Sequence, residues 1–323
     1  MIVGVLRETA PRETRVALTP EGVRTLSTAG LRVVVEAGAG QGAGFADAAY
    51  RASGAVVADR ATVFERAGIV VWVKPPAYEL DSLPLRAGTT LVGFQDPHYR
   101  RHEIDRLRAR GIESVAFDRV PRDETTTEID ALTTMSRIAG GVGYAEGRRL
   151  LSPSRRTGPV RALVLGCGAA GLAAIAAART FDDEKPTAVG NRLAQRDAAF
   201  EAGAGRFVPN RDDNAALLES LATTTPDLVV CTAVHRGSPA PRLLDQKALD
   251  LLGPGAVVVD LVAKAGGNCV ATVADRTATL PNGVVVTHRS NYPASRPEPA
   301  SHAYGSAAAA MVLRIARGTA DVP

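Results

Sequence analysis

Short apolar runs of the kind that form buried strands recur along the chain, and helical patterns separate them. Strands that alternate with helices pair in parallel, and the helices then cover both faces of the sheet. We therefore expect an α/β fold of two doubly wound parallel-sheet domains. The expected strands of the first domain span residues 2–6, 31–36, 69–73, 90–94 and 114–117, and those of the second span 162–165, 187–189, 206–208, 227–231, 256–260 and 284–287.

Residues typical of helix starts and loops locate further elements along the chain. Thr19 and Pro20 are typical of an N-cap and a first helical turn, and the glycine-rich stretch 38–45 is typical of a loop. A long helical pattern over 128–151 joins the two domains, and a closing helix over 300–317 returns to the first. We expect a first domain of residues 1–127 and 300–323 and a second domain of residues 128–299.

The strand at 162–165 leads directly into a glycine-rich turn, GCGAAG, and an alanine-rich helical pattern follows. This is the context that a dinucleotide site requires. Gly166 permits the tight turn, Gly168 lets backbone N–H groups approach the pyrophosphate, and Gly171 lets the helix lie close to its strand. We expect a Rossmann-like dinucleotide-binding domain whose turn contacts the cofactor through Gly166, Gly168, Ala169, Ala170 and Gly171.

The next strand, at 187–189, ends without the acidic residue that accepts from the ribose 2′-hydroxyl in NAD sites. Gly190 stands there, followed by Asn191 and Arg192. A carboxylate would repel a 2′-phosphate, whereas a guanidinium can pair with it and stack on adenine. We expect Asn191 and Arg192 to bind the cofactor, with NADP favoured over NAD. The alternative is that Arg192 points to solvent and NAD binds through its pyrophosphate.

Composition places the chain among soluble globular proteins, with 46% hydrophobic and 22% charged residues. No apolar run reaches the roughly 18 residues of a membrane helix, and the N-terminus opens on a strand pattern. We expect a cytoplasmic protein without a membrane partner. Cys167, Cys231 and Cys269 lie near strand ends without metal-ligand spacing, so we expect buried thiols and no metal site.

The formal charge of +4 raises the question of nucleic-acid binding, but acidic residues are interleaved with the arginines. The densest basic run, 99–110, carries Ile104 and Leu107 at the spacing of one buried helix face. It carries no interleaved aromatic platform on which bases could stack. We expect an amphipathic helix there and no nucleic-acid partner.

Two cations follow expected strands of the first domain, at the sheet edge where open parallel sheets bind ligands. The guanidinium of Arg15 can clamp a carboxylate with two parallel bonds, and the ammonium of Lys74 can polarise a carbonyl. Either residue alone would also fit an ordinary surface. Together they indicate a small carboxylate-bearing substrate.

Several stretches, in order along nearly the whole chain, resemble the alanine dehydrogenase and pyridine nucleotide transhydrogenase α-subunit family. They are ETRVALTP, EAGAGQGAGF, VKPP, VPR with IDALTTMSRIAG, GCGAAG, and VVVDLVAKAGGNC with NYPASRP. The resemblance implies two Rossmann-like domains with a cleft between them, of which the first binds the substrate. It also implies a homo-oligomer, for which we favour a dimer, and hydride transfer between a nicotinamide and a small keto, imino or amino acid. In the dehydrogenase branch, the positions matching Arg15 and Lys74 bind the carboxylate and carbonyl of pyruvate.

The chain departs from that family at the proton-carrying positions. Asp96 stands where dehydrogenase members have a catalytic histidine, with His98 two residues on, and Lys264 replaces their aspartate. An amino-acid dehydrogenase needs a group that moves protons to and from the amine. We expect Asp96 or His98 to take this role, with Lys264 beside the nicotinamide, although ordinary polar loop residues would look the same.

The transhydrogenase branch uses an Arg, Gln, Asp loop beside the nicotinamide, where Arg122 and Asp130 match but Thr127 replaces the glutamine. That branch also has an insertion before the strand at 227–231 and a longer C-terminus. We therefore expect a stand-alone enzyme. The alternatives are the nucleotide-binding α subunit of a proton-translocating transhydrogenase and a non-catalytic nucleotide sensor. Further expected cofactor contacts are Thr133, Ser136, Thr232, Ala233, Val234 and, at the nicotinamide carboxamide, Asn291.

His235 and Arg236 stand where the family has an apolar residue and a proline. They could face the cleft and bind a second anionic group on a substrate. Exposed loop residues would give the same pattern.

Overall fold

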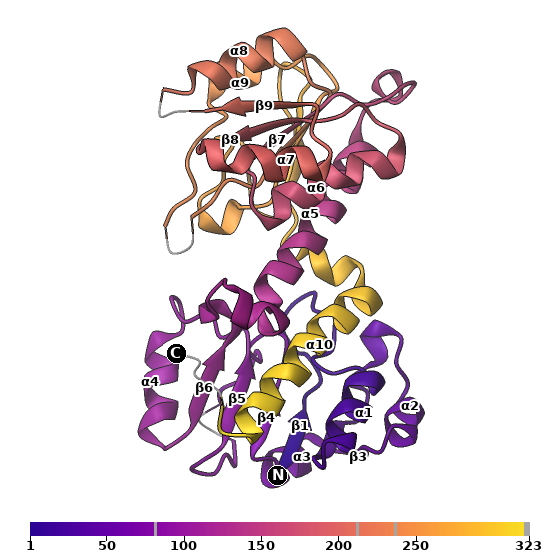
Figure 1. The fold of residues 1–323 in the computed structure, drawn as a ribbon, viewed down its shortest axis with the longest axis vertical. Helices are drawn as coiled ribbons and strands as arrows, with labels where there is room; N and C mark the ends of the chain where they lie inside the picture. Colours follow the sequence, from indigo (N-terminus) through magenta and orange to yellow (C-terminus); the bar gives the residue numbers. More distant parts are fainter. Residues whose placement is uncertain (81–82, 211–212, 236–237, 320–323) are drawn as a thin grey trace. The chain divides into compact units, whose positions relative to one another are not determined.

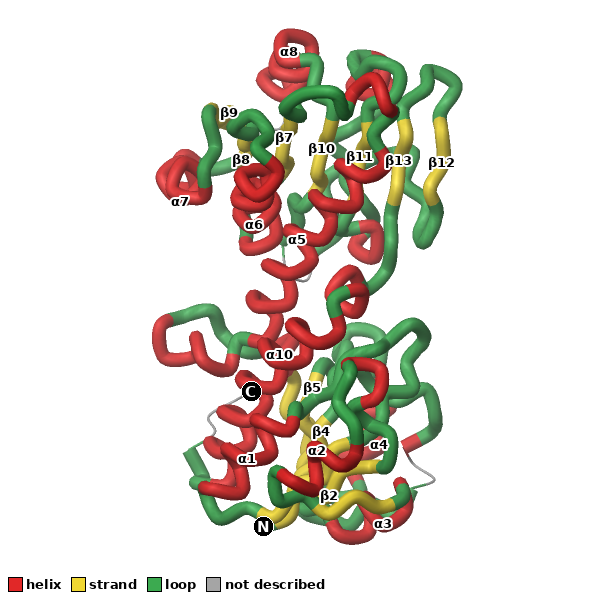
Figure 2. Tube along the Cα trace, turned by 90° about the vertical axis from the view of Figure 1, so that its right-hand side faces the viewer, coloured by secondary structure: helices red, strands yellow, loops and turns green. Residues whose placement is uncertain are grey.

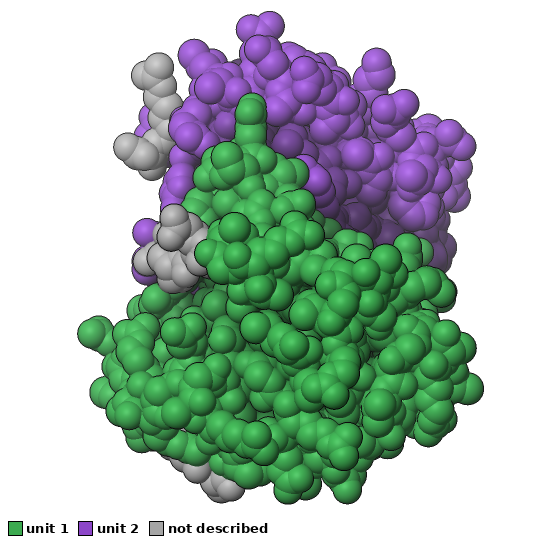
Figure 3. All heavy atoms as spheres, turned by 60° about the horizontal axis from the view of Figure 1, so that its bottom comes forward, with its two compact units in different colours: residues 1–135, 293–323 green, residues 136–292 purple. Residues whose placement is uncertain are grey.

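The computed structural model describes residues 1–80, 83–210, 213–235 and 238–319. Arg236 and the end of the closing segment, residues 320–323, thus lie outside the described residues. The chain divides into two compact units, Met1–Met135 with Pro293–Pro323, and Ser136–Tyr292 (Figure 3). In each unit, helices cover both faces of one sheet (Figures 1 and 2).

The first unit contains a six-stranded parallel sheet in the order β3-β2-β1-β4-β5-β6. The order reverses between β1 and β4, and ligands bind at the carboxyl ends of strands at such a point. The strands are β1 (Ile2–Val5), β2 (Arg32–Glu36), β3 (Val56–Ala58), β4 (Ile69–Val71), β5 (Thr90–Gly93) and β6 (Glu113–Ala116).

Helices α1 (Pro20–Thr28), α2 (Asp47–Ala52), α3 (Arg60–Arg66), α4 (Arg101–Ala109) and α10 (Pro297–Ala316) surround this sheet. The start of α1 is as expected, since the Thr19 hydroxyl accepts the N–H of Gly22 and Pro20 opens the helix. The basic run forms α4 and buries Leu107, which confirms the amphipathic helix. Helix α10 packs against α1 and β5.

The second unit contains a seven-stranded sheet in the order β12-β13-β11-β10-β7-β8-β9. Only β12 runs antiparallel to its neighbour among the described strands. The strands are β7 (Ala162–Leu165), β8 (Thr187–Gly190), β9 (Arg206–Pro209), β10 (Leu228–Cys231), β11 (Val257–Asp260), β12 (Thr277–Thr279) and β13 (Val285–Thr287). The expected α/β fold of two doubly wound sheets is confirmed.

Helix α5 (Ala131–Leu150) carries the chain from the first unit into the second. The long helix expected from residue 128 begins later, because the chain turns at Asp130, whose carboxylate accepts the N–H of Thr133 at 2.8 Å. The second unit also contains α6 (Ala169–Ala178), α7 (Arg196–Ala202), α8 (Ala215–Thr224) and α9 (Gln246–Asp250). Short 3₁₀ turns span Gln41–Ala43, Phe117–Arg119, Glu124–Ile129, Pro153–Arg155, Arg179–Phe181, Leu193–Gln195, Ala263–Ala265 and Tyr292–Ser295.

The three cysteines are buried free thiols, as expected. Within the described ranges, no helix is long and apolar enough to span a membrane. No group of three or more His, Cys, Asp or Glu side chains suited to a metal ion occurs in the same ranges.

Candidate functional site

The glycine-rich turn lies between β7 and α6, where the sheet order of the second unit reverses. Gly166 has φ +97°, and a Cβ there would lie 2.8 Å from the Thr232 hydroxyl oxygen. A Cβ at Gly171 would lie 1.8 Å from the carbonyl oxygen of Gly166. The fold therefore excludes side chains at both positions, because the first turn of α6 lies directly against the end of β7.

Gly168 differs from these two glycines. It is exposed at the N-cap of α6, no side chain caps that end, and no atom lies within 4 Å of the position of an added Cβ. Protein packing thus leaves open space in front of the helix N-terminus, where backbone N–H groups and the helix dipole favour an anion. Ala169 and Ala170, both half-buried, open the helix. These residues fit a dinucleotide pyrophosphate.

The loop after β10 borders this turn. The Thr232 hydroxyl donates to the Leu165 carbonyl at 2.8 Å, and the backbone of Ala233 exchanges two hydrogen bonds with the side chain of Asn268, at 2.9 and 2.8 Å. Val234 follows with 44% of its surface exposed. Sequence reasoning missed Asn268, whose side chain holds this loop in place.

Asp260 at the end of β11 holds the turn that carries Lys264. Its buried carboxylate accepts the N–H groups of Asn268 and Cys269 at 2.9 and 3.1 Å and the hydroxyl of Thr272 at 2.8 Å. Lys264 itself is exposed in a 3₁₀ turn. The signal that could have identified Asp260 is a carboxylate closing an otherwise apolar strand, because a buried carboxylate requires donors.

The end of β8 has no room for a carboxylate. A Cβ on Gly190 would lie 2.7 Å from the Gln195 Oε1 atom and 2.9 Å from the Phe207 ring. Asn191 and Arg192 follow and are exposed. Protein atoms therefore fill the position that a side chain on Gly190 would take, and a ligand at this edge would meet Asn191 and Arg192.

Several residues expected to contact the nicotinamide lie just before α5 or on it. The Nε atom of Arg122 lies 4.0 Å from an Asp130 carboxylate oxygen, and the buried Asp130 also binds the N–H of Thr133. Ser136 is half-buried on α5 in the second unit. Asn291, with φ +66°, lies in the turn that follows β13.

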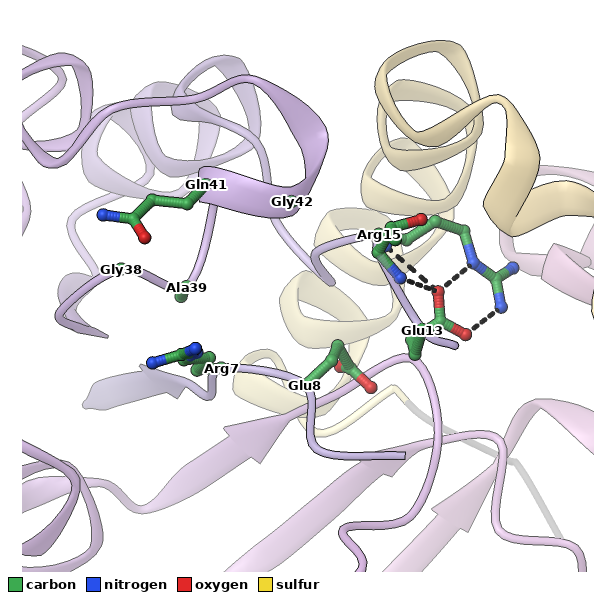
Figure 4. Close-up of a pocket in the computed structure, with 9 residues that line it drawn as sticks. Arg7, Glu8, Glu13, Arg15, Gly38, Ala39, Gln41 and Gly42 are labelled. Atoms are coloured by element: carbon green, nitrogen blue, oxygen red, sulfur yellow. Dashed lines mark hydrogen bonds and ion pairs between the residues drawn. The ribbon is translucent and has the colours of Figure 1, made fainter. Parts of the chain in front are cut away.

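The first unit has a cavity of about 350 Å³ at the carboxyl ends of β1 and β2 (Figure 4). Residues after β1 form one side, and the glycine-rich loop after β2 forms the other. The lining residues are Arg7, Glu8, Glu13, Thr14, Arg15, Gly38, Ala39, Gln41 and Gly42.

Arg15 is buried at this cavity and is held by Glu13. Its Nε and Nη2 atoms donate to the two carboxylate oxygens at 2.7 and 2.6 Å (Figure 4), while Nη1 donates to the Met135 sulfur at 3.1 Å. The Lys74 Nζ atom lies 3.9 Å from the same Glu13 carboxylate. Glu13, which sequence reasoning missed, thus brings both expected substrate-binding cations together.

Glu8 fixes the backbone that precedes the two prolines of the VKPP turn. Its carboxyl oxygens accept the N–H groups of Val73 and Lys74 at 2.6 and 3.1 Å. Part of the Glu8 surface remains exposed, but burial of the carboxyl raises its pKa to about 8. The nearby Glu13 raises this pKa further, and the two backbone donors partly oppose the shift.

Glu8 should make the stability of the protein depend on pH. Because its folded-state pKa of about 8 exceeds the ordinary value of 4.5, the folded state holds the proton more tightly. Its stabilising contribution is complete below pH 4.5 and is lost as the pH rises toward 8. The difference in unfolding free energy between wild type and Glu8→Gln should therefore fall by up to about 1.4 kcal/mol per pH unit across this window. Denaturant titrations at several pH values measure it, and a difference independent of pH contradicts the assignment.

Asp96 and His98 follow β5 but do not line the cavity. Asp96 has φ +51°, and the Asp118 carboxylate accepts its N–H at 3.3 Å. His98 is exposed, and its ring centroid lies 5.1 Å from that of Tyr99.

The chain was compared with models of known protein families, and two domain models match it. The model of the alanine dehydrogenase/PNT N-terminal domain matches residues 4–139, and that of the C-terminal domain matches residues 133–322. The chain is 34% identical to the NAD(P) transhydrogenase subunit alpha of Cereibacter sphaeroides, across 95% of this chain and 64% of that protein. It is 31% identical to the alanine dehydrogenase of Mycobacterium tuberculosis, across 98% and 88%.

Solved structures agree. A transhydrogenase from Sinorhizobium meliloti superposes with a TM-score of 0.89 at 29% identity, covering 98% of this chain and 94% of that one. An L-alanine dehydrogenase superposes with a TM-score of 0.85 at 26% identity, covering 98% and 90%. This chain spans 64% of the length of the transhydrogenase α subunits of C. sphaeroides and Haemophilus influenzae. With both domain models matched in order, the chain belongs to the alanine dehydrogenase/PNT family.

Proposed function

We propose that this protein is a nicotinamide-dinucleotide-dependent oxidoreductase that transfers hydride between the nicotinamide and the α-carbon of a small keto, imino or amino acid, with NADP favoured over NAD. We further propose a cytoplasmic homo-oligomer, with a dimer favoured. The observation that carries the proposal is Gly168. A residue at the tip of α6 that packing does not require to be glycine is explained by a ligand that approaches the backbone there.

The proposed substrate class is inferred from two cations of the first unit, Arg15 and Lys74. Arg15 would bind the substrate carboxylate, and Lys74 would polarise the carbonyl or imine. Glu13 already engages Arg15 with both carboxylate oxygens, so the substrate would have to share or displace that partner. This arrangement favours a substrate with a full negative charge, because an anionic group competes with the Glu13 carboxylate for Arg15 better than a neutral group does.

Proton transfer is proposed for Asp96 or His98, with Lys264 beside the nicotinamide. Bound dinucleotide would supply or accept the hydride. His98 is exposed, while the Asp118 carboxylate fixes the turn at Asp96 by accepting the N–H groups of Gln95 and Asp96. Cofactor contacts are proposed for the glycine turn, for the loops after β8 and β10, and for Arg122, Asp130, Thr133, Ser136 and Asn291.

Calorimetric titration with NADP and NAD tests the cofactor assignment. NADP should bind more tightly, because the end of β8 lacks the carboxylate that would repel the 2′-phosphate and offers Arg192 instead. Tighter binding of NAD contradicts the choice of NADP. Absence of binding of either dinucleotide contradicts the proposed function as a whole.

A second candidate is the nucleotide-binding part of a transhydrogenase. The 34% identity to the C. sphaeroides α subunit favours it. Co-purification with a membrane partner would support this candidate over the stand-alone enzyme. A third candidate is a non-catalytic nucleotide sensor. Such a protein would bind the cofactor tightly but would not turn over any acid.

A further inference from the structure

The loops that follow β8 and β10 meet beside the glycine-rich turn. Both strands are direct neighbours of β7 in the sheet, so their carboxyl ends flank the start of α6 on either side. The Asn191 Nδ2 atom, just after β8, lies 3.3 Å from the His235 Nε2 atom, just after β10. Both side chains are exposed. Two loops therefore present side-chain nitrogen atoms at one place on the edge of the candidate cofactor site.

Two backbone N–H groups near this contact already donate to acceptors within the protein. The N–H of Arg192 donates to the Gln195 Oε1 atom at 3.1 Å, and the N–H of Thr232 donates to the Leu165 carbonyl at 2.8 Å. Gly190 is buried against Gln195 and Phe207. An anion bound at this edge would therefore depend mainly on side chains rather than on backbone donors.

The charges at this edge are suited to an anion. Residues 187–195 and 228–235 include Arg192 and His235 but neither aspartate nor glutamate. With the Asn191 amide nitrogen donating to Nε2, the imidazole of His235 carries its proton on Nδ1 and keeps a donor there.

We propose that His235 is a specificity-determining residue that binds the 2′-phosphate of NADP together with Asn191 and Arg192. The inference rests on the proposed dinucleotide function and assigns His235 to the cofactor, whereas the sequence pattern alone suggested an anionic group of the substrate. The contact that changes this assignment is the one to Asn191, which follows the strand that ends at the ribose in dinucleotide-binding folds.

The test compares NADP and NAD binding to wild type, His235→Gln and a control, His102→Gln, by calorimetric titration. His102 is an exposed histidine on α4, so the same chemical change is made in the other unit. His235→Gln should weaken NADP binding about tenfold and change NAD binding less than about twofold, since one charge-assisted hydrogen bond to the phosphate is lost. The control should change neither.

Equal weakening of both dinucleotides would assign His235 a structural role and overturn the proposal, as would an unchanged NADP affinity. If wild type prefers NAD, the NADP assignment of the proposed function fails, and the role of His235 fails with it. If wild type prefers NADP and His235→Gln retains the full preference, only the role of His235 is wrong.

Discussion

Replacing Arg15 with alanine should lower the free energy of unfolding by about 3 to 5 kcal/mol. The side chains of Glu13 and Arg15 are 0% and 2% exposed and share two short charge-assisted hydrogen bonds. Without the guanidinium, the buried Glu13 carboxylate would lose both of these hydrogen bonds, and the Lys74 Nζ atom lies 3.9 Å away. Denaturant unfolding of the variant and wild type measures the loss.

The double variant Glu13→Ala/Arg15→Ala is the control for this explanation. When both Glu13 and Arg15 are replaced, no buried carboxylate is left without its guanidinium partner. The double variant should therefore be more stable than Arg15→Ala alone. Losses that simply add would show that the two residues are energetically independent.

Arg15→Ala should also raise the KM for the carboxylate substrate, and unchanged kinetics would rule out the carboxylate clamp.

Gly168→Ala should fold normally and lose dinucleotide binding by roughly a hundredfold. The space around the added methyl group is open and the backbone φ of −85° suits alanine, so the protein itself tolerates the change. The methyl group would, however, occupy the approach of the pyrophosphate to the N-terminus of α6 and cost about two charge-assisted hydrogen bonds. Thermal unfolding and calorimetric titration of the same sample separate the two effects.

Two other glycines serve as references for that variant. Gly158→Ala adds a methyl group in open space outside the turn and should change neither folding nor binding. Gly171→Ala places its methyl group 1.8 Å from the Gly166 carbonyl oxygen and should destabilise the fold itself. If Gly168→Ala binds dinucleotides like wild type, the pyrophosphate does not lie at this helix end.

Periodicity and turn chemistry were enough to predict much of the fold. The strand at 162–165 and the N-cap at Thr19 have the expected positions, because a fully buried strand and a capped helix each leave a local pattern. Strand β3 and helix α3 were missed. β3 has three residues, and Val56 is 52% exposed, so neither its length nor its burial leaves a distinct pattern.

The candidate site was less accessible to sequence reasoning, since it depends on contacts that spacing does not reveal. Arg15 and Lys74 were predicted individually, but the fold was needed to place the Glu13 carboxylate between them. The absence of an acid at Gly190 was visible in the sequence, whereas the packing of Gln195 and Phe207 against it was not. The contact between Asn191 and His235 likewise joins loops from separate strands.

Hydride transfer from NADPH to a small 2-keto acid can be measured in a single assay. Oxidation of NADPH, followed by its absorbance, is measured with a panel of small 2-keto acids, each with and without ammonium or an amine. We expect NADPH oxidation with at least one 2-keto acid, and its loss when the carboxylate is replaced by an amide, because Arg15 requires that charge. Tight NADPH binding without oxidation by any member of the panel would rule out hydride transfer to such acids and favour a nucleotide sensor.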